Sequence, residues 1–249
     1  MQSLEKSKVR KYLGLTAIEG EKEIEMAMVA GIEFQTIFFL KELANNDLLI
    51  KIERKYPGAE FISLSKDLFT KISYRESTGG FLVVAKTLVK TLETLKLPKN
   101  PLILIIEAVE KPGNLGAILR TADAANVDAV VCCNLPSDVY NPNVIRSSLG
   151  TVFTVPLAIA NNAETMAWLK QHKIVTYCTN LHKAKDYHLQ NFTQGCAIVM
   201  GTEATGASSE WINFANQNIK IPMLGKIDSI NVSVATAIVV YEAKRQRGF

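Results

Sequence analysis

The sequence has few features that would hold a metal ion, a disulfide or a membrane anchor. Its three histidines stand between His172 and His188 without the H-E-x-x-H or H-x-E spacing of a catalytic zinc site. Its four cysteines show no C-x-x-C spacing and lie in apolar stretches, which is typical of core thiols. They are Cys132, Cys133, Cys178 and Cys196. No apolar run approaches the roughly 20 residues that span a bilayer. We therefore expect no metal and no membrane segment.

Signatures of nucleotide binding and of hydrolysis are also lacking. No G-x-G-x-x-G follows Glu107 and no Lys-Ser/Thr follows Gly206, so the dinucleotide fingerprint and the P-loop both fail. There is no G-x-S-x-G turn, and no histidine stands in the two glycine-rich turns to activate a nucleophile. These absences disfavour a dehydrogenase, a kinase and a hydrolase.

Length and charge set broader limits. The chain has 249 residues with 48% hydrophobic content, enough for one large or two modest domains. A net charge of +4, from 28 basic and 24 acidic side chains, permits nucleic-acid binding without demanding it. The N-terminus MQSLEKSKVRKYLG has charges where a signal peptide has its apolar region, so we expect a cytoplasmic protein.

The first part of the chain, residues 1–95, predicts a small α/β domain. Helical patterns cover residues 20–30 and 48–54, and strands are predicted at 35–40, 60–65 and 81–86. The stretch 91–101 contains two prolines and few β-branched residues, so we expect a linker there.

The second part, residues 96–249, alternates apolar strands with helices. Strands are predicted at 102–107, 128–133, 151–156, 173–178 and 196–200. A loop is predicted at 110–116, and helices at 117–125, 163–171 and from 232 onward. Continuous apolar strands between helices are typical of a mainly parallel sheet that is covered on both faces. We expect this α/β architecture.

Two stretches of the second part contain candidate site residues. In KPGNLGAILRTADA, glycines permit a tight turn where a parallel strand ends, which is where open α/β sheets bind ligands. Asn114 could equally cap a helix there, and Arg120 could form a surface ion pair. Near the C-terminus, Ser229, Asn231 and Ser233 precede a buried helix and are all N-cap types.

Three segments in order carry a specific resemblance. NLGAILRTADA, VMGTEATG and IPMLGKIDSINVSVATAI resemble the three consecutive motifs of the SpoU (TrmH-like) RNA 2′-O-ribose methyltransferases of the SPOUT superfamily. The resemblance covers roughly Leu102 to Arg247. Less closely, KSKVRKYLG, IEGEKEIEMAM and STGGFLVVA resemble the small substrate-binding domain that precedes the catalytic domain in many members. The family implies a C-terminal trefoil knot, a homodimer and S-adenosylmethionine (AdoMet) as cofactor.

The resemblance also implies roles for particular residues. The positions that match the family's cofactor contacts, or lie beside them, are Met200, Gly201, Gly206, Ile221, Met223 and Ile230. The positions that match its active site are Asn114, Arg120, Glu203, Ser229 and Asn231. Because a guanidinium stays protonated in proteins, we expect Arg120 to grip a phosphate and stabilise a developing alkoxide instead of acting as a base.

The predicted function is AdoMet-dependent methylation of a ribose 2′-hydroxyl in RNA. Ribosomal RNA is the favoured substrate, because an added N-terminal domain is common among members that act on it; transfer RNA is the alternative. Candidate phosphate contacts are Lys8, Arg10, Lys11 and Arg146, although each could be solvated surface. A catalytically silent RNA-binding assembly factor is a rival. Methylation of a base is disfavoured because the three motifs offer no Cys or Asp nucleophile.

Overall fold

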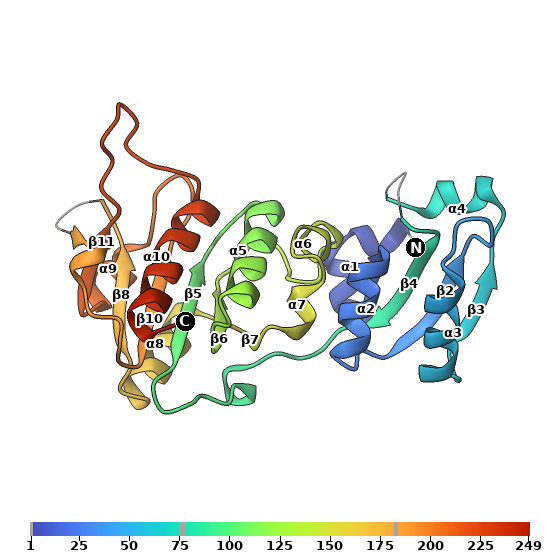
Figure 1. Cartoon of the computed structure of the whole chain (residues 1–249), viewed down its shortest axis with the longest axis horizontal. Coiled ribbons are helices and arrows are strands. Elements are labelled where there is room, and N and C mark those ends of the chain that lie inside the picture. The colour runs from blue at the N-terminus through green and yellow to red at the C-terminus, as the bar shows by residue number, and fades with distance from the viewer. Residues whose placement is uncertain (1, 75–77, 182–183) are drawn as a thin grey trace. The chain divides into compact units, whose positions relative to one another are not determined.

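The computed structural model describes residues 2–74, 78–181 and 184–249. The chain forms two compact units (Figure 1). The first unit comprises residues 1–89 and 137–154, and the second unit comprises residues 90–136 and 155–249. Each unit has its own sheet.

The first unit is built on a four-stranded sheet with the strand order β1-β4-β2-β3. β4 runs antiparallel to β1 and β2, whereas β2 and β3 are parallel. The strands are β1 (Leu15–Glu19), β2 (Phe34–Phe39), β3 (Glu60–Ser63) and β4 (Phe81–Lys86). The helices are η1 (Gln2–Glu5), α1 (Ser7–Leu13), α2 (Glu21–Val29), α3 (Asn46–Lys55), α4 (Lys66–Ile72), α6 (Pro142–Ser147) and α7 (Thr151–Thr154). The predicted small α/β domain therefore contains one strand, β1, that the sequence pattern did not indicate.

A buried ion pair joins α1 to the segment 137–154 inside the first unit. Arg10 is 1% exposed, and its guanidinium donates two hydrogen bonds to the Asp138 carboxylate, at 3.1 and 2.5 Å. Its third nitrogen donates to the carbonyl oxygens of Leu4 and Glu5. Burial acts to raise the pKa of Asp138, but hydrogen bonds from Arg10 and Ser7 and the nearby positive charges outweigh it and lower that pKa.

The second unit is built on a seven-stranded sheet with the order β7-β6-β5-β10-β8-β11-β9, in which every pairing is parallel. The strands are β5 (Leu102–Glu107), β6 (Ala129–Cys133), β7 (Leu157–Ala160), β8 (Val175–Thr179), β9 (Lys185–Asp186), β10 (Cys196–Met200) and β11 (Gln217–Lys220). The helices are η2 (Leu92–Thr94), α5 (Pro112–Ala124), α8 (Asn162–Gln171), η3 (Tyr187–Leu189), α9 (Ser209–Phe214) and α10 (Val232–Arg247).

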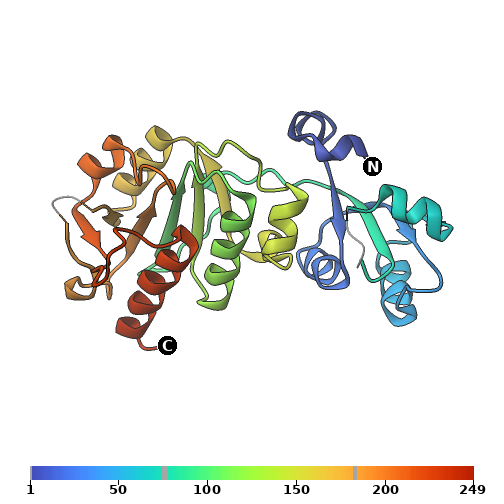
Figure 2. The ribbon, with the colours of Figure 1, turned by 90° about the horizontal axis from the view of Figure 1, so that it is seen from above.

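Helices cover both faces of this sheet. Figure 2 shows α5 and α10 on one face and α8 and α9 on the other. Side chains alternate along each strand, so Ile103 and Ile105 of β5 join the core that contains Trp211 of α9 and Leu169 of α8. All six residues of β5 and all five of β10 are buried. This confirms the predicted mainly parallel sheet covered on both faces.

The C-terminal end of α10 is fastened to neighbouring loops of the second unit. The Arg247 guanidinium donates to the carbonyl oxygens of Asn100, Phe192 and Gln194. Gln246 accepts the N–H of Phe192 and donates to the carbonyl of Gln190. These contacts hold the last turn of the helix in place. The trefoil knot implied by the resemblance stays a prediction.

One predicted strand is wrong. The content of Val, Thr and Phe predicts a strand over residues 151–156, but this segment begins with the short helix α7. Gly150 has φ of 82°, and a Cβ there would lie 2.8 Å from the Cβ of Met26, so the chain turns tightly against α2. Thr151 and Thr154 donate their hydroxyls to backbone carbonyls three residues earlier, which stabilises the helical turn. The strand of this region is β7, which begins after Pro156.

The segment predicted as a linker contributes to the second unit. Leu92 is buried in its core, with Leu95 and Leu97 packed against that core. The predicted boundary between residues 95 and 96 stays a prediction, and the structure adds that residues 137–154 group with the first unit. In the part of the chain that is described, no helix is long and apolar enough to cross a membrane.

We expect Arg10→Ala to lower the free energy of unfolding by about 3 to 5 kcal/mol, because it leaves the Asp138 carboxylate buried without its charged partner. Since the pKa of Asp138 is lowered in the folded protein, this stabilisation is present above the pKa of an unfolded aspartate, about 3.9, and is lost as pH falls through the folded value. Urea unfolding of wild type and variant at pH 7 and pH 3 measures both effects.

Lys22→Ala, which removes an exposed charge from α2, is the control and should change the free energy of unfolding by less than about 0.5 kcal/mol. If Arg10→Ala matched this control at pH 7, the buried pair would not stabilise the first unit.

Candidate active site

The candidate site lies where the strands of the second unit end. β5 and β10 are parallel neighbours, with Ile106 opposite Met200, so the loops that follow them leave the sheet at the same edge. β8 and β11 also run parallel to β10 and end at that edge. Ligands of open α/β sheets bind in this position, at the carboxyl ends of the strands.

Three predicted active-site residues are joined by hydrogen bonds. Asn114, in the first turn of α5, donates from Nδ2 to Glu203 Oε1 at 2.5 Å and accepts at Oδ1 from Asn231 Nδ2 at 3.1 Å. Asn231 is the N-cap of α10, where its Oδ1 accepts the N–H of Ser233 at 2.9 Å. The structure thus brings together residues that are 89 and 117 positions apart in the chain.

Only one orientation of these amides satisfies every bond. A carboxylate can only accept, so Asn114 must present its NH₂ group to Glu203 and its oxygen to Asn231. Burial acts to raise the pKa of Glu203, but hydrogen bonds from Asn114 and from backbone N–H groups, together with the charge of Lys111, lower that pKa. Glu203 is therefore ionised at neutral pH. Each asparagine NH₂ keeps a second N–H that can donate to a substrate oxygen.

The loop after β10 folds back tightly on Gly201. The N–H of Thr202 donates to the carbonyl of Gly206 at 2.9 Å, and the N–H of Gly206 donates back to the carbonyl of Thr202 at 3.2 Å. A Cβ on Gly201 would lie 2.1 Å from the nitrogen of Ala207 and from the carbonyl carbon of Gly206. Only glycine fits there. Gly206 has φ of 71°, in the left-handed region.

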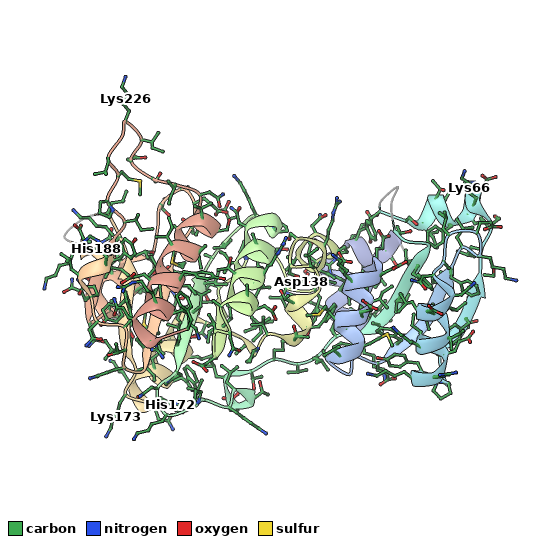
Figure 3. The ribbon with its side chains drawn as sticks, in the orientation of Figure 1. Lys66, Asp138, His172, Lys173, His188 and Lys226 are labelled. Atoms are coloured by element: carbon green, nitrogen blue, oxygen red, sulfur yellow. The ribbon has the colours of Figure 1, made fainter. Side chains whose placement is uncertain are left out.

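The predicted apolar wall lies in the segment between β11 and α10. Ile221, Met223 and Ile230 are each partly exposed, and Leu224 is 98% exposed. Figure 3 places Lys226 at the tip of this segment, which projects beyond the end of the sheet. Met200, by contrast, is 2% exposed at the end of β10, so it can offer a ligand little more than its backbone.

Two predicted active-site residues stand outside the hydrogen-bonded cluster. Arg120 is exposed on α5 and is turned about 120° around the helix axis from Asn114, since the two are six residues apart. Within residues 2–74, 78–181 and 184–249, no side chain forms a hydrogen bond or ion pair with its guanidinium. Ser229 donates to the neighbouring Asp228 carboxylate at 3.0 Å and is exposed.

The predicted RNA contacts lie in the first unit, and the structure corrects one of them. Arg10 is buried and all three of its nitrogens donate to protein oxygens, so it is not available to a phosphate. Lys8 and Lys11 are exposed on α1. A cluster of basic residues in sequence cannot show which one faces inward, because α1 has a buried and an exposed side.

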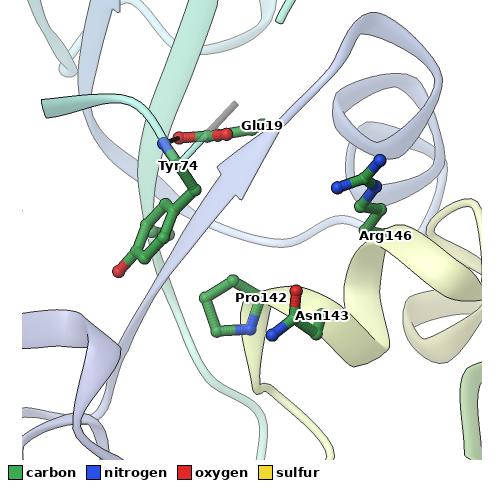
Figure 4. Close-up of a pocket in the computed structure, with 6 residues that line it drawn as sticks. Glu19, Tyr74, Pro142, Asn143 and Arg146 are labelled. Carbon is green, nitrogen blue, oxygen red and sulfur yellow. Dashed lines mark hydrogen bonds between the residues drawn. The ribbon is translucent and has the colours of Figure 1, made fainter. Parts of the chain in front are cut away.

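Arg146, also exposed, lies on α6 at a small polar hollow (Figure 4). The hollow is also lined by Glu19, Tyr74, Pro142 and Asn143, and the N–H of Tyr74 donates to Glu19 Oε1 at 2.7 Å. Its volume of about 30 Å³ admits a water molecule but not a nucleobase. Arg146 is therefore placed to meet a ligand only at the surface.

The four cysteines lie in the core, as predicted. All four are buried and free. Burial raises the pKa of Cys133 to about 12, with a hydrogen bond from Thr165 acting in the opposite direction. Such thiols are poor nucleophiles at neutral pH. Among the described residues, no three of His, Cys, Asp and Glu gather where they could hold a metal ion.

Two polar residues behind the loop after β10 were not predicted. Glu107 is 4% exposed and Asn162 is 5% exposed, and they are hydrogen-bonded to each other at 2.8 Å. The signal that could have found Glu107 is a charged residue that ends an otherwise apolar strand, LILIIE. Asn162 follows another asparagine that caps α8, and nothing in the sequence separates their roles.

We expect Gly201→Ala to lower the free energy of unfolding by about 1 to 3 kcal/mol, because backbone atoms of the loop would have to move away from the new methyl group. Gly113→Ala is the control: its Cβ meets nothing within 4 Å, so it should be neutral or stabilising. Chemical denaturation measures both. Equal stability of the two variants would mean that the loop does not press on Gly201 in solution.

Comparison with known proteins agrees with this geometry. Residues 101–241 match the SpoU rRNA Methylase family, and residues 1–83 match the MRM3-like substrate binding domain. The chain is 30% identical to the 23S rRNA (guanosine(2553)-2′-O)-methyltransferase RlmP of Bacillus subtilis, over 96% of this chain and 91% of that protein. It is 27% identical to the 23S rRNA (uridine(2479)-2′-O)-methyltransferase of Streptomyces viridochromogenes, over 96% of this chain and 85% of the relative.

Solved structures are similar over almost the whole chain. The crystal structure of an RNA 2′-O ribose methyltransferase has a TM-score of 0.85 at 35% identity, covering 99% of this chain and 94% of that one. The SpoU methyltransferase AviRb from Streptomyces viridochromogenes, in complex with AdoMet, has a TM-score of 0.90 at 25% identity, covering 99% and 97%. The family match spans more than half of the chain and includes the Asn114, Glu203 and Asn231 cluster, so this protein belongs to the SpoU rRNA methylase family.

Proposed function

We propose that this protein transfers a methyl group from AdoMet to the 2′-hydroxyl of a ribose in ribosomal RNA. The observation that carries the proposal is the hydrogen-bonded cluster of Asn114, Glu203 and Asn231 at the carboxyl edge of a SpoU-type sheet. Relatives named for 2′-O-methylation of 23S rRNA support the substrate class. The cytoplasm, predicted from the sequence, agrees with such a substrate.

The residues present fit AdoMet. The absence of a side chain at Gly201 leaves the backbone of the loop close to the end of β10, where peptide groups can bind the polar edge of an adenine. Ile221, Met223 and Ile230 are apolar side chains left partly exposed, and they can cover the flat faces of a cofactor. When bound, AdoMet supplies the electrophilic methyl group.

The asparagine cluster is suited to hold the ribose hydroxyl. Asn114 and Asn231 each have one amide N–H that their mutual contacts leave available, and both are fixed in direction by the Glu203 carboxylate and the first turn of α10. Fixed donors of this kind orient a hydroxyl and stabilise negative charge that develops on its oxygen. Exposed Ser229, two residues before Asn231, is placed to shape the entrance.

We propose that Arg120 binds the phosphate next to the reacting ribose. Its guanidinium is exposed and unpaired among the described residues, so it can accept an external anion without breaking an internal bond. It cannot take the hydroxyl proton, because it stays protonated. In this scheme the proton passes to the phosphate or to water, while Arg120 stabilises the oxygen that loses it.

We further propose a homodimer. Val234, Ile238 and Tyr241 stand at positions i, i+4 and i+7 of α10 and so share one side of that helix. Val234 is 50% and Tyr241 43% exposed, which leaves an apolar stripe without cover in the single chain. Packing of a second copy of the chain along this stripe would bury its apolar side chains.

For the first unit we propose that RNA lies across α1. Lys8 and Tyr12 are one turn apart on the side of α1 opposite the buried Arg10, and Lys11 flanks them. Tyr12 is 87% exposed. A lysine pair around an exposed aromatic ring can bind two phosphates while a base stacks on the ring. Arg146 is a further candidate phosphate contact.

The function is tested with tritiated AdoMet and total RNA from a strain that lacks the gene. Label should appear in the ribosomal fraction and, after digestion, in a 2′-O-methylated nucleoside. Label in the transfer RNA fraction would replace the substrate assignment. Binding of RNA without any transfer of label would favour a silent RNA-binding protein of this fold.

We expect Arg120→Ala to reduce the rate of methyl transfer by about 10²- to 10³-fold, because a charge that stabilises the reacting oxygen is removed. The dissociation constant for AdoMet, measured by calorimetry, should change by less than about twofold, since Arg120 is assigned to the RNA side of the reaction. Lys173→Ala, at the opposite end of the second unit from Lys226 (Figure 3), is the control. Near-normal turnover of Arg120→Ala would remove Arg120 from the active site.

We expect the double variant Lys8→Ala, Lys11→Ala to weaken RNA binding and to reduce the slope of log K against log salt by about 1.4 to 1.8, the value for two lost phosphate contacts. Fluorescence anisotropy with a labelled ribosomal RNA fragment at several salt concentrations measures this. The charge-matched control, Lys22→Ala with Lys51→Ala, removes two exposed lysines elsewhere in the first unit. If both variants lowered the slope equally, α1 would have no special part in binding.

A further inference from the structure

A buried polar cluster supports the loop after β10 from the side opposite its exposed face. Glu107, the last residue of β5, accepts at Oε1 from Asn162 Nδ2 and at Oε2 from the backbone N–H of Ser208, both at 2.8 Å. Asn162 also donates to Glu210 Oε2 at 2.9 Å and accepts from Trp211 Nε1 at 3.0 Å. The cluster ties together β5, α8 and α9.

Burying the side chain of Glu107 at this position is energetically unfavourable. Glu107 ends a strand in which all six residues are buried, and it is 4% exposed itself. Removing a carboxylate from water is unfavourable unless hydrogen bonds compensate for it. An apolar residue at this position would avoid that cost in the core. What an apolar residue cannot do is accept the N–H of Ser208.

The hydrogen bond to Ser208 fixes the loop next to its contact with Gly201. Ile106 is the register partner of Met200, so Glu107 and Gly201 occupy the next position on the neighbouring strands. The peptide between Gly206 and Ala207 presses on Gly201, and Ser208 follows directly. Glu107 therefore holds the end of the loop, at Ser208, close to its beginning, at Gly201.

The same loop contains Glu203, which fixes Asn114. A continuous series of contacts thus runs from Glu107 through Ser208 and the 201–207 loop to the asparagine cluster. None of the roles assigned above uses Glu107 or Asn162, and neither touches the proposed position of the substrate.

We infer that Glu107, held by Asn162, is a positioning residue that sets the AdoMet-binding conformation of the 201–208 loop. The inference rests on the proposed function in so far as AdoMet is the ligand of that loop. For this role the Glu107 carboxylate must accept two hydrogen bonds at once. A side chain of the same shape that accepts only one leaves a buried donor without a partner.

Glu107→Gln tests this requirement. The glutamine oxygen can accept from Ser208 or from Asn162, but its NH₂ group then meets the other donor. We expect the dissociation constant for AdoMet, measured by calorimetry, to rise about tenfold. At saturating AdoMet the turnover should stay within about threefold, because the atoms that meet the RNA are unchanged. Hydrogen exchange of the Ser208 amide should become faster.

A variant in which the donors and acceptors of the cluster change places should restore AdoMet binding. In the triple variant Glu107→Gln, Asn162→Asp, Glu210→Gln, the new aspartate accepts from both new glutamines and from Trp211 Nε1. The side-chain oxygen of the glutamine at position 107 then accepts from Ser208. Every bond of the cluster is restored, with its direction reversed where needed. We expect AdoMet affinity to return to within about twofold of wild type, and the ¹H–¹⁵N signal of the Trp211 indole to mark the intact bond.

Asn161→Ala is the matched control. It removes the capping box of α8 next to Asn162, and so lowers the melting temperature, without touching Glu107 or Ser208. Its affinity for AdoMet should equal that of wild type. If Glu107→Gln lowered the melting temperature as this control does but left AdoMet affinity and Ser208 exchange unchanged, Glu107 would be a structural residue only. Failure of the triple variant to restore affinity would also overturn the inference.

Different results would overturn the proposed function and the positioning role of Glu107. If wild-type protein did not bind AdoMet, the proposed function would fall, while exchange of the Ser208 amide in Glu107→Gln would still report whether the carboxylate holds the loop. If wild type bound AdoMet and Glu107→Gln bound it equally well, the positioning role alone would fall.

Discussion

The parallel pairing of β10 with β5 is the constraint on which the candidate site depends. The two strands meet in register from Cys196 and Leu102 to Met200 and Ile106. Because the strands point the same way, their loops leave the sheet side by side, and Asn114 reaches Glu203 across 89 positions of sequence. A shift of two residues would separate these side chains by more than a hydrogen bond can span.

The loops gain their shape from groups that are buried behind them. Glycine at position 201 lets the backbone of the 201–207 loop come into contact with the end of β10, and the Glu107 carboxylate binds the N–H where that loop enters α9. Both features belong to the sheet edge, and both residues are buried. The exposed part of the site is therefore specified from inside the core, where contacts have few alternatives.

In the first unit a buried charge, that of Arg10, determines which side of α1 is exposed. Arg10 lies in a run of basic residues that suggests a nucleic-acid contact, yet its side chain binds Asp138 and two backbone carbonyls. By turning Arg10 inward, α1 presents Lys8 and Tyr12 outward. The residue that organises this surface is thus distinct from those that can bind a ligand on it.

The sequence by itself determined the parallel sheet, the segments that form most of its strands, and the family, because apolar runs between glycine-rich turns and three ordered motifs are local patterns. It also indicated that Asn114, Glu203 and Asn231 belong together. Only the tertiary structure decided that these three touch while Arg120 stands apart, that Arg10 is buried, that residues 151–154 form a helix, and that Glu107 supports the loop after β10. Each of these depends on which side of an element meets a neighbour distant in sequence, and local residue patterns do not fix that choice.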